Sequence, residues 1–228
     1  MDCAVGEFKM PILVSDIEDT DSRSTRELDW FEGPCCLRER DWTEQEFLQL
    51  DQSQEPHFFE FTDGQIDFPG WPCLLHQSVC GEIGSALHHF MRDQRLGDCL
   101  MGVCPIRLWP GRWACPDISW HLPDRVARLP SRNDYYHGAD GVMEVLSYEQ
   151  SWRDWDLVRK RADYARAGIF EYWIVDPETD AITILTLENG AYQLYGEFVR
   201  GTTAASGTLR GFEVNVSELF AKSDPLRW

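Results

Sequence analysis

Two acidic residues stand in segments of the sequence where a sheet would normally place apolar side chains. Glu144 lies in the middle of the strand-like run GVMEVLS, and Asp117 lies near the start of another, in CPDISW. An ionised carboxylate in an apolar environment costs several kcal/mol unless it is paired, neutralised or bound to a metal. Two carboxylates that converge from neighbouring strands repel each other, and a divalent cation between them removes that repulsion. Mg²⁺ is such a cation, and the pair therefore suggests metal-assisted phosphodiester hydrolysis.

This chemistry also needs a cation that orients or activates water. Side chains two residues apart share one face of a strand, but the residue sharing the face of Glu144 is Leu146, which cannot serve. The chain has eighteen arginines and three lysines, and Lys160 follows the Glu144 strand in a helical segment. Lys160 is therefore a candidate to reach back over the end of the sheet. The alternative is an exposed ion pair with Asp156 at the i, i+4 spacing.

The segments around these residues predict an α/β domain with a mixed sheet. Thr43 and Glu46 have the spacing of a capping box, and Asp63-Gly64 and Asn189-Gly190 have the composition of turns between strands. Helices are expected after Thr43, at 76–94, at about 152–167 and at 217–220. Strands are expected on both sides of Asp63-Gly64 and at 99–108, 114–120, 141–147 and 171–176. A further pair of strands is expected to form a hairpin over 181–195. The punctuated segment 121–139 is expected to be a loop.

Charge and cysteine content limit the class of protein. The net charge of −18 argues against a protein that coats nucleic acid through bulk positive charge. The acidic excess is concentrated at the front, so we expect residues 1–40 to be an acidic, flexible N-terminal extension and residues 41–228 to form the domain. A strand formed by MPILV at the edge of the domain is the alternative. The eight cysteines include no CxxC pair, and no signal peptide or long apolar run is present, so we expect reduced thiols in a cytoplasmic protein without a membrane span.

Other candidate ligands have simpler interpretations. The spacing of His88, His89 and His121 does not match a zinc site, which favours surface or packing roles. Tyr164, one turn after Lys160, either lines the site or packs in the core, and the second role is more common at that spacing.

Several longer stretches resemble a known family. PDISW, MEVLS, DLVRKRADYARAGIFEYWIVDP and GFEVNVSELF are similar to the Uma-type (Uma-two) family of the PD-(D/E)xK, or restriction-endonuclease-like, superfamily. The similarity runs from about Trp42 to Phe220. The stretch FEFTDGQI, followed by His76, also resembles the front of the family.

The resemblance implies a restriction-endonuclease-like mixed β-sheet flanked by helices, with a C-terminal β-hairpin. It implies a metal-dependent endonuclease that hydrolyses phosphodiester bonds in DNA, with Asp117 and Glu144 holding Mg²⁺ or Mn²⁺ and Lys160 acting on the water. Glu60 matches the acidic residue at the front of the family and is an additional candidate. The expected partners are nucleic acid, DNA before RNA, and a second copy of the chain, but no membrane. The alternative is a catalytically silent module that keeps the nuclease fold for binding or regulation.

Overall fold

The computed structural model describes residues 35–37, 41–51, 59–68, 72–102, 104–131, 134–147, 155–221 and 224. All of them belong to one unit, Gly33–Trp228. Of the segment 1–40, in which the sequence predicts a flexible extension, only strand β1 (Cys35–Leu37) lies within the described residues. The proposed MPILV strand lies outside them.

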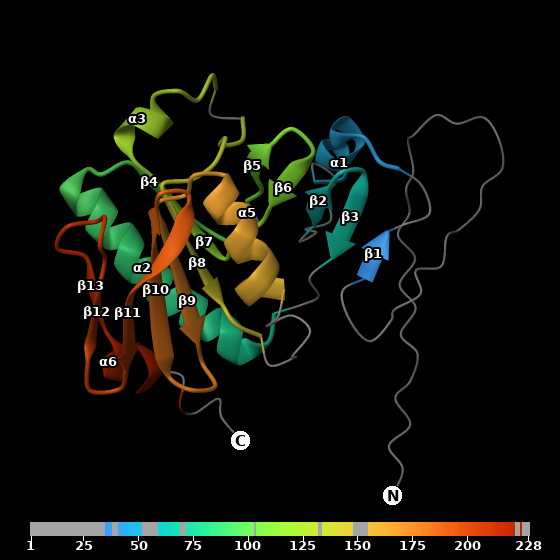
Figure 1. The fold of residues 1–228 in the computed structure, drawn as a ribbon. Helices are drawn as coiled ribbons and strands as arrows, with labels where there is room; N and C mark the ends of the chain where they lie inside the picture. Colours follow the sequence, from blue (N-terminus) through green and yellow to red (C-terminus); the bar gives the residue numbers. More distant parts are fainter. Residues whose placement is uncertain are drawn as a thin grey trace, which may run out of the picture. The chain divides into compact units, whose positions relative to one another are not determined.

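The larger of two main sheets has six strands and is mixed (Figure 1). Its spatial order is β11-β10-β9-β8-β7-β4. The strands are β4 (Asp98–Met101), β7 (Ile118–His121), β8 (Gly141–Val145), β9 (Glu171–Asp176), β10 (Ala181–Glu188) and β11 (Ala191–Val199). Only the central pair β8–β9 is parallel among these strands, and the other neighbours are antiparallel. The predicted α/β class and the hairpin β10–β11 are confirmed.

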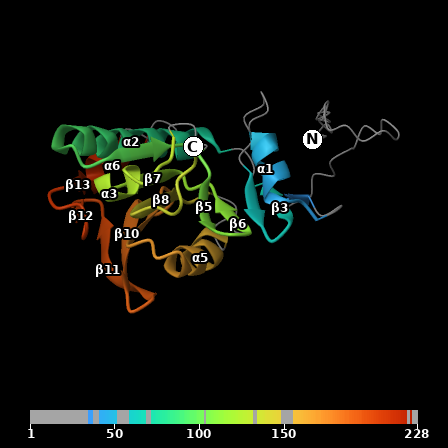
Figure 2. The same ribbon diagram turned by 90° about the horizontal axis from the view of Figure 1, so that it is seen from above.

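Helices lie on both faces of this sheet (Figure 2). Helix α2 (Leu74–Gln94) covers one face, and its residues Val79, Ile83 and Leu87 are buried in a core with the sheet, as their spacing predicts. Helix α6 (Val216–Ala221) and the small sheet of β12 (Thr203–Ala205) and β13 (Glu213–Asn215) contribute to the same core.

The other face is covered by the crossover between the parallel strands β8 and β9. A single π-helical turn, η1 (Trp155–Lys160), continues directly into α5 (Arg161–Arg166). Tyr164 from α5 packs in a second core with Leu146 and Tyr172 from the sheet. Lys160 is the last residue of η1, and such π-helical turns occur often at functional sites.

The smaller sheet has the order β1-β3-β2-β6-β5. Its strands are β2 (Glu60–Thr62), β3 (Gln65–Phe68), β5 (Ile106–Trp109) and β6 (Arg112–Ala114), together with β1. Helix α1 (Glu44–Asp51) packs Phe47 against this sheet, and it begins at the predicted capping box, in which the Thr43 hydroxyl accepts from the Glu46 backbone amide. The turn at Asp63-Gly64 also forms as predicted.

Two predicted strands are each divided between the sheets. The segment 99–108 breaks at Gly102, whose φ of 81° is left-handed, so that β4 joins the larger sheet and β5 the smaller. The segment 114–120 is also divided: β6 ends at Ala114 in the smaller sheet, and β7 begins at Ile118 in the larger one. Within the predicted loop 121–139, Pro123–Val126 form the short helix α3.

A glycine fixes how β7 and β8 pair. Trp120 lies opposite Gly141, and a Cβ atom at position 141 would overlap the ring of the fully buried Trp120. The same register pairs Ile118 with Met143. Asp117 directly precedes Ile118, and Glu144 directly follows Met143.

Candidate active site

The two carboxylates singled out by the sequence lie at neighbouring positions of the sheet. Asp117 directly precedes β7, and its Oδ2 accepts a hydrogen bond from the backbone amide of Val145 on β8 at 2.8 Å. The sheet therefore brings Asp117 to the strand that carries Glu144.

Lys160 reaches this position from η1. Its Nζ lies 2.9 Å from Oε2 of Glu144, and both side chains are buried. The alternative of a solvent-exposed Lys160 is therefore wrong. Leu146 instead packs in the core beneath α5.

Tyr164 lies one turn after Lys160 and serves both roles that the sequence allowed. Its ring packs in the core, and its hydroxyl donates to Oε1 of Glu144 at 2.5 Å. Burial and the negative charge of Glu144 raise the pKa of the Tyr164 hydroxyl well above its ordinary value, so Tyr164 stays a neutral donor. Two donors from one helical segment thus fix the carboxylate of Glu144.

Glu60 lies on the far side of Lys160, with Oε1 3.7 Å from Nζ. Its main partner is Arg112, whose Nη2 lies 2.8 Å from Oε2 of Glu60 and whose Nε lies 2.8 Å from Oδ2 of Asp163. Burial alone would raise the pKa of Glu60, but the charges of Arg112 and Lys160 hold it below its ordinary value. Lys160 therefore connects two buried carboxylates, of which one also contacts a buried arginine.

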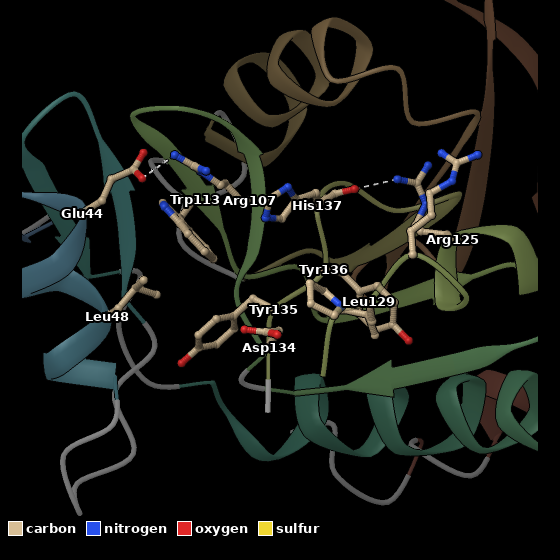
Figure 3. A pocket seen from close by; sticks show the side chains of 12 residues that line it. Glu44, Leu48, Arg107, Trp113, Arg125, Leu129, Asp134, Tyr135, Tyr136 and His137 are labelled. Carbon is tan, nitrogen blue, oxygen red and sulfur yellow. Dashed lines mark hydrogen bonds and ion pairs between the residues drawn. The ribbon is translucent and has the colours of Figure 1, made fainter. Parts of the chain in front are cut away.

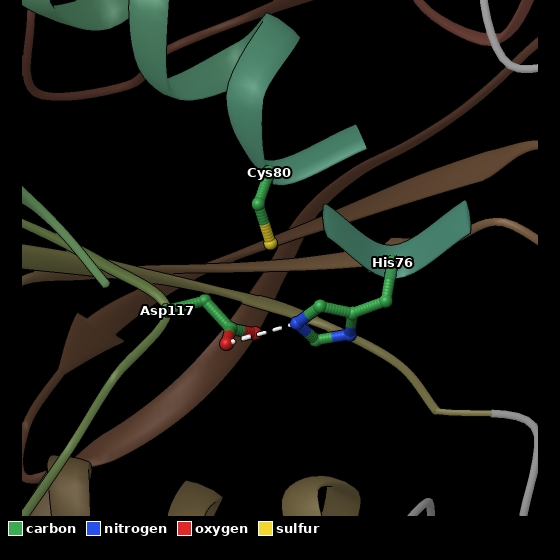
Figure 4. Close-up of side chains that lie close together, drawn as sticks. All are labelled: His76, Cys80 and Asp117. Atoms are coloured by element: carbon green, nitrogen blue, oxygen red, sulfur yellow. Dashed lines mark hydrogen bonds and ion pairs between the residues drawn. The ribbon is translucent and has the colours of Figure 1, made fainter. Parts of the chain in front are cut away.

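Asp117 has a separate set of neighbours on α2, shown in Figure 4. Nε2 of His76 lies 3.1 Å from Oδ1 of Asp117. Burial favours a higher pKa for Asp117, but His76, Lys160 and the Val145 amide lower it. Cys80, one turn after His76, directs its Sγ to the same point, and ligand atoms of the three side chains lie within 4.8 Å of one another.

Each of the two carboxylates has its own donors or cations in the fold, which offset the cost of its burial. Their chemistry nevertheless fits Mg²⁺, because they supply hard oxygen ligands from adjacent positions. A carboxylate oxygen has two lone pairs, so one that accepts a hydrogen bond can still bind a metal ion.

Asp117 and Cys80 also line a cavity of about 290 Å³ between α2 and the ends of β4 and β6. Cys115 lines the same cavity, but its thiol donates to the carbonyl of Phe59. This side of the site is therefore accessible to a small ligand.

A second cavity, of about 470 Å³, combines arginine and aromatic side chains (Figure 3). Its lining includes Arg107, Arg125, Arg128, Trp113 and Tyr135. Arg107 lies over the ring of Trp113 at 5.9 Å and also pairs with Glu44, while Arg125 pairs with Asp140. The cavity is a local concentration of cations on an acidic protein.

Sequence reasoning missed Arg112, Cys80 and the role of His76. The i, i+4 spacing of His76 and Cys80 on a predicted helix is a usable signal for two ligands on one face, whereas no local pattern marks Arg112 as buried. His121 is a packing residue as expected, with its ring stacked on Tyr136 at 3.7 Å, and His88 and His89 are exposed.

Comparisons with known proteins agree with this architecture. A family model named Uma2, with the description "Putative restriction endonuclease", matches residues 44–217. The chain is also similar to a crystal structure of "a putative nuclease belonging to DUF820" from Anabaena variabilis, with a TM-score of 0.61 and 17% sequence identity over 80% of this chain and 99% of that one. No curated protein matches the sequence. Among the described residues, no helix has the length and apolar character that crossing a membrane requires.

Proposed function

Because the chain belongs to the Uma2 family, we propose that it is a metal-dependent endonuclease that hydrolyses phosphodiester bonds in DNA. The observation that supports this most directly is the buried contact between Lys160 and Glu144, with Asp117 on the neighbouring strand. Two carboxylates can hold a divalent ion, and the ammonium group can act on a water next to it.

Asp117 and Glu144 would hold Mg²⁺ or Mn²⁺ through their carboxylate oxygens. When bound, the ion would supply Lewis-acid stabilisation of the attacked phosphate and lower the pKa of a bound water.

Lys160 has the role of orienting the attacking water and offsetting negative charge on the phosphate. An ammonium on a flexible stem suits this task, because its three donors can rearrange when substrate enters. Tyr164 positions Glu144 by donating to one carboxylate oxygen. Glu60 positions Lys160 from the other side and does not itself meet the substrate.

The cavity of Figure 3 is the best candidate for contact with nucleic acid away from the reaction centre. Arginines there can bind phosphates, and Trp113 and Tyr135 offer aromatic faces on which a base can stack. Binding through these arginines is expected to weaken with salt. Preference for DNA over RNA, a homodimer and a cytoplasmic location stay predictions.

One observation favours a second candidate, a silent binding or regulatory module. Both oxygens of Glu144 accept hydrogen bonds from the protein, so the cluster is also a complete structural unit without a metal. Calorimetric titration with Mg²⁺ and Mn²⁺ separates the candidates, because a binding module gives no heat of ion binding at this site.

The decisive experiment incubates the protein with supercoiled and single-stranded DNA in the presence of Mn²⁺ or Mg²⁺. We expect nicking that is lost in Glu144→Gln and kept in Glu213→Gln, which makes the same change at an exposed position of strand β13. Absence of cleavage in the unmodified protein, together with absence of ion binding, would contradict the nuclease proposal.

A further inference from the structure

The cluster of His76, Cys80 and Asp117 contains a ligand that a magnesium site does not need. Mg²⁺ binds oxygen and avoids sulfur, whereas thiolate and imidazole favour Zn²⁺ and similar ions. His76 and Cys80 lie one turn apart on α2 and point the same way, and Asp117 meets them from the sheet (Figure 4). The donor set is therefore of mixed character, with one nitrogen, one sulfur and one oxygen.

The distances between the donor atoms are close to those of a zinc site. With zinc–ligand bonds of 2.0 to 2.3 Å, tetrahedral geometry separates neighbouring donor atoms by about 3.4–3.6 Å. Nε2 of His76 and Oδ1 of Asp117 are 3.1 Å apart, and no pair in the cluster exceeds 4.8 Å. Closing the widest pair needs a movement of about 1 Å, which a side-chain rotation at Cys80 can supply.

We propose that His76, Cys80 and Asp117 form a binding site for a thiophilic divalent ion, with Zn²⁺ as the matching metal. The three side chains supply three ligands, and the cavity lined by Cys80 and Asp117 leaves the fourth position to water. The same cavity gives the ion a path into the site. The site differs from the proposed magnesium site in two of its ligands and shares Asp117 with it.

Binding exchanges protons for metal. Burial, together with the charges of Asp117 and Glu144, raises the pKa of Cys80, so the free protein holds a thiol. Metal binding forms a zinc–sulfur bond, and the thiol proton leaves to solvent. The proton between His76 and Asp117 is displaced in the same way.

Sharing of Asp117 has a regulatory consequence, which rests on the proposed nuclease function. An Asp117 oxygen held by Zn²⁺ is withdrawn from Mg²⁺, so Zn²⁺ inhibits Mg²⁺-dependent cleavage. Cys80 then determines sensitivity to zinc without taking part in hydrolysis.

The first test measures binding without reference to cleavage. Titration of the full-length protein with Co²⁺, a coloured substitute for Zn²⁺, is followed by optical absorption. We expect a thiolate-to-cobalt charge-transfer band that saturates at one ion per chain and disappears when Zn²⁺ is added. Cys80→Ser should abolish the band and weaken Zn²⁺ binding at least tenfold, whereas Cys115→Ser, a change in the same cavity, should leave both unaltered. A missing band in the unmodified protein, or an unchanged band in Cys80→Ser, overturns the proposal.

A second measurement needs no variant and covers the case in which Cys80→Ser fails to fold. Alkylation of the unmodified protein is followed at each cysteine by mass spectrometry, with and without Zn²⁺. Zinc should slow alkylation of Cys80 at least tenfold and leave Cys115 unchanged. Equal modification of Cys80 in both conditions overturns the site.

The regulatory consequence is tested last, on cleavage of supercoiled DNA in Mg²⁺. Zn²⁺ should inhibit the unmodified protein, and Cys80→Ser should need at least tenfold more Zn²⁺ for the same inhibition. Equal sensitivity of the two proteins contradicts competition for Asp117. If neither protein cuts DNA, the nuclease proposal fails, while the cobalt band still decides the metal site.

Discussion

Glu60 and Glu144 are two buried glutamates on either side of one lysine, yet their surroundings differ. Glu60 also pairs with Arg112, which is 1% exposed and contacts Asp163 as well. Glu144 is held by Lys160 and by the hydroxyl of Tyr164. A guanidinium group stays charged and binds in a fixed planar geometry, whereas an ammonium group is compact and can change partners. The comparison suggests that the Glu60 side maintains the fold and the Glu144 side performs the chemistry.

The largest effect is expected from a substitution that removes the arginine partner of Glu60. Arg112→Met removes the cation between Glu60 and Asp163 and leaves a buried carboxylate with less compensation, so the free energy of unfolding should fall by about 3–5 kcal/mol. Chemical denaturation measures this change. Arg200→Met, at an exposed arginine that also pairs with two aspartates, is the control and should lose much less stability, because solvent screens exposed ion pairs. Equal losses in the two variants would remove the structural distinction.

Lys160→Met removes the ion pair between Lys160 and Glu144. DNA cleavage should fall at least about 100-fold, because the group that orients water is lost, while the loss of stability should be smaller than for Arg112→Met. Lys160→Arg should not restore cleavage, since the wider guanidinium does not fit between two buried carboxylates. Cleavage rates and denaturation curves of the same preparations measure both quantities. Recovery of activity in Lys160→Arg would show that charge alone is needed.

The stability of the fold should depend on pH through buried groups whose pKa differs between the folded and the unfolded chain. Burial and nearby Arg125 lower the pKa of His121 to about 3, against 6.5 for a free histidine. The unfolded chain therefore binds a proton that the folded protein does not, and stability should fall by about 2 kcal/mol between pH 7 and pH 5. His121→Phe should flatten this part of the curve. An unchanged slope in that variant would assign the loss to other groups.

The contribution of Glu60 to stability should be lost at a lower pH than that of His121. Its pKa is lowered in the fold, so its contribution is fully present above about pH 4.5 and is lost as the pH falls through the lowered value. The loss attributed to Glu60 should therefore begin only after that of His121. Denaturation curves of Glu60→Gln from pH 5 to pH 3 measure it against the unmodified protein.

The smallest expected effect concerns Tyr164. Tyr164→Phe removes one hydrogen bond to a charged carboxylate, which should lower the free energy of unfolding by about 1.5 kcal/mol. Tyr192→Phe is the matched control, because its hydroxyl donates to the neutral carbonyl of Ile169 and should cost about 1 kcal/mol or less. Cleavage should decrease in Tyr164→Phe alone. Equal activity of the two variants would assign Tyr164 to packing.

The sequence predicted the elements whose signals are local. Thr43 with Glu46, the buried spacing of α2 and the β10–β11 hairpin depend on residues close together along the chain, and all three form as expected. The candidates Asp117, Glu144 and Lys160 were also found, because charged residues stand out in apolar surroundings. Their roles stay predictions.

The rest depends on contacts between distant parts of the chain. Glu60 and Arg112 are 52 residues apart, and His76 and Asp117 are 41 apart. No window of sequence reveals that these side chains meet, and nothing in the residues next to Arg112 marks it as buried. The division of 99–108 at Gly102 was missed for a related reason, since apolar periodicity continues across a residue whose left-handed backbone ends the strand.

The absence of a side chain at Gly141 has a consequence for mutational studies of this protein. Because Trp120 packs directly against the backbone there, any larger residue must displace the tryptophan, and β7 moves with it. Asp117 would then lose its contact with the Val145 amide on β8, although position 141 is about 10 Å along that strand from Glu144. In a saturation screen for activity, position 141 should therefore tolerate no substitution and resemble a catalytic residue, while contributing no chemical group at all.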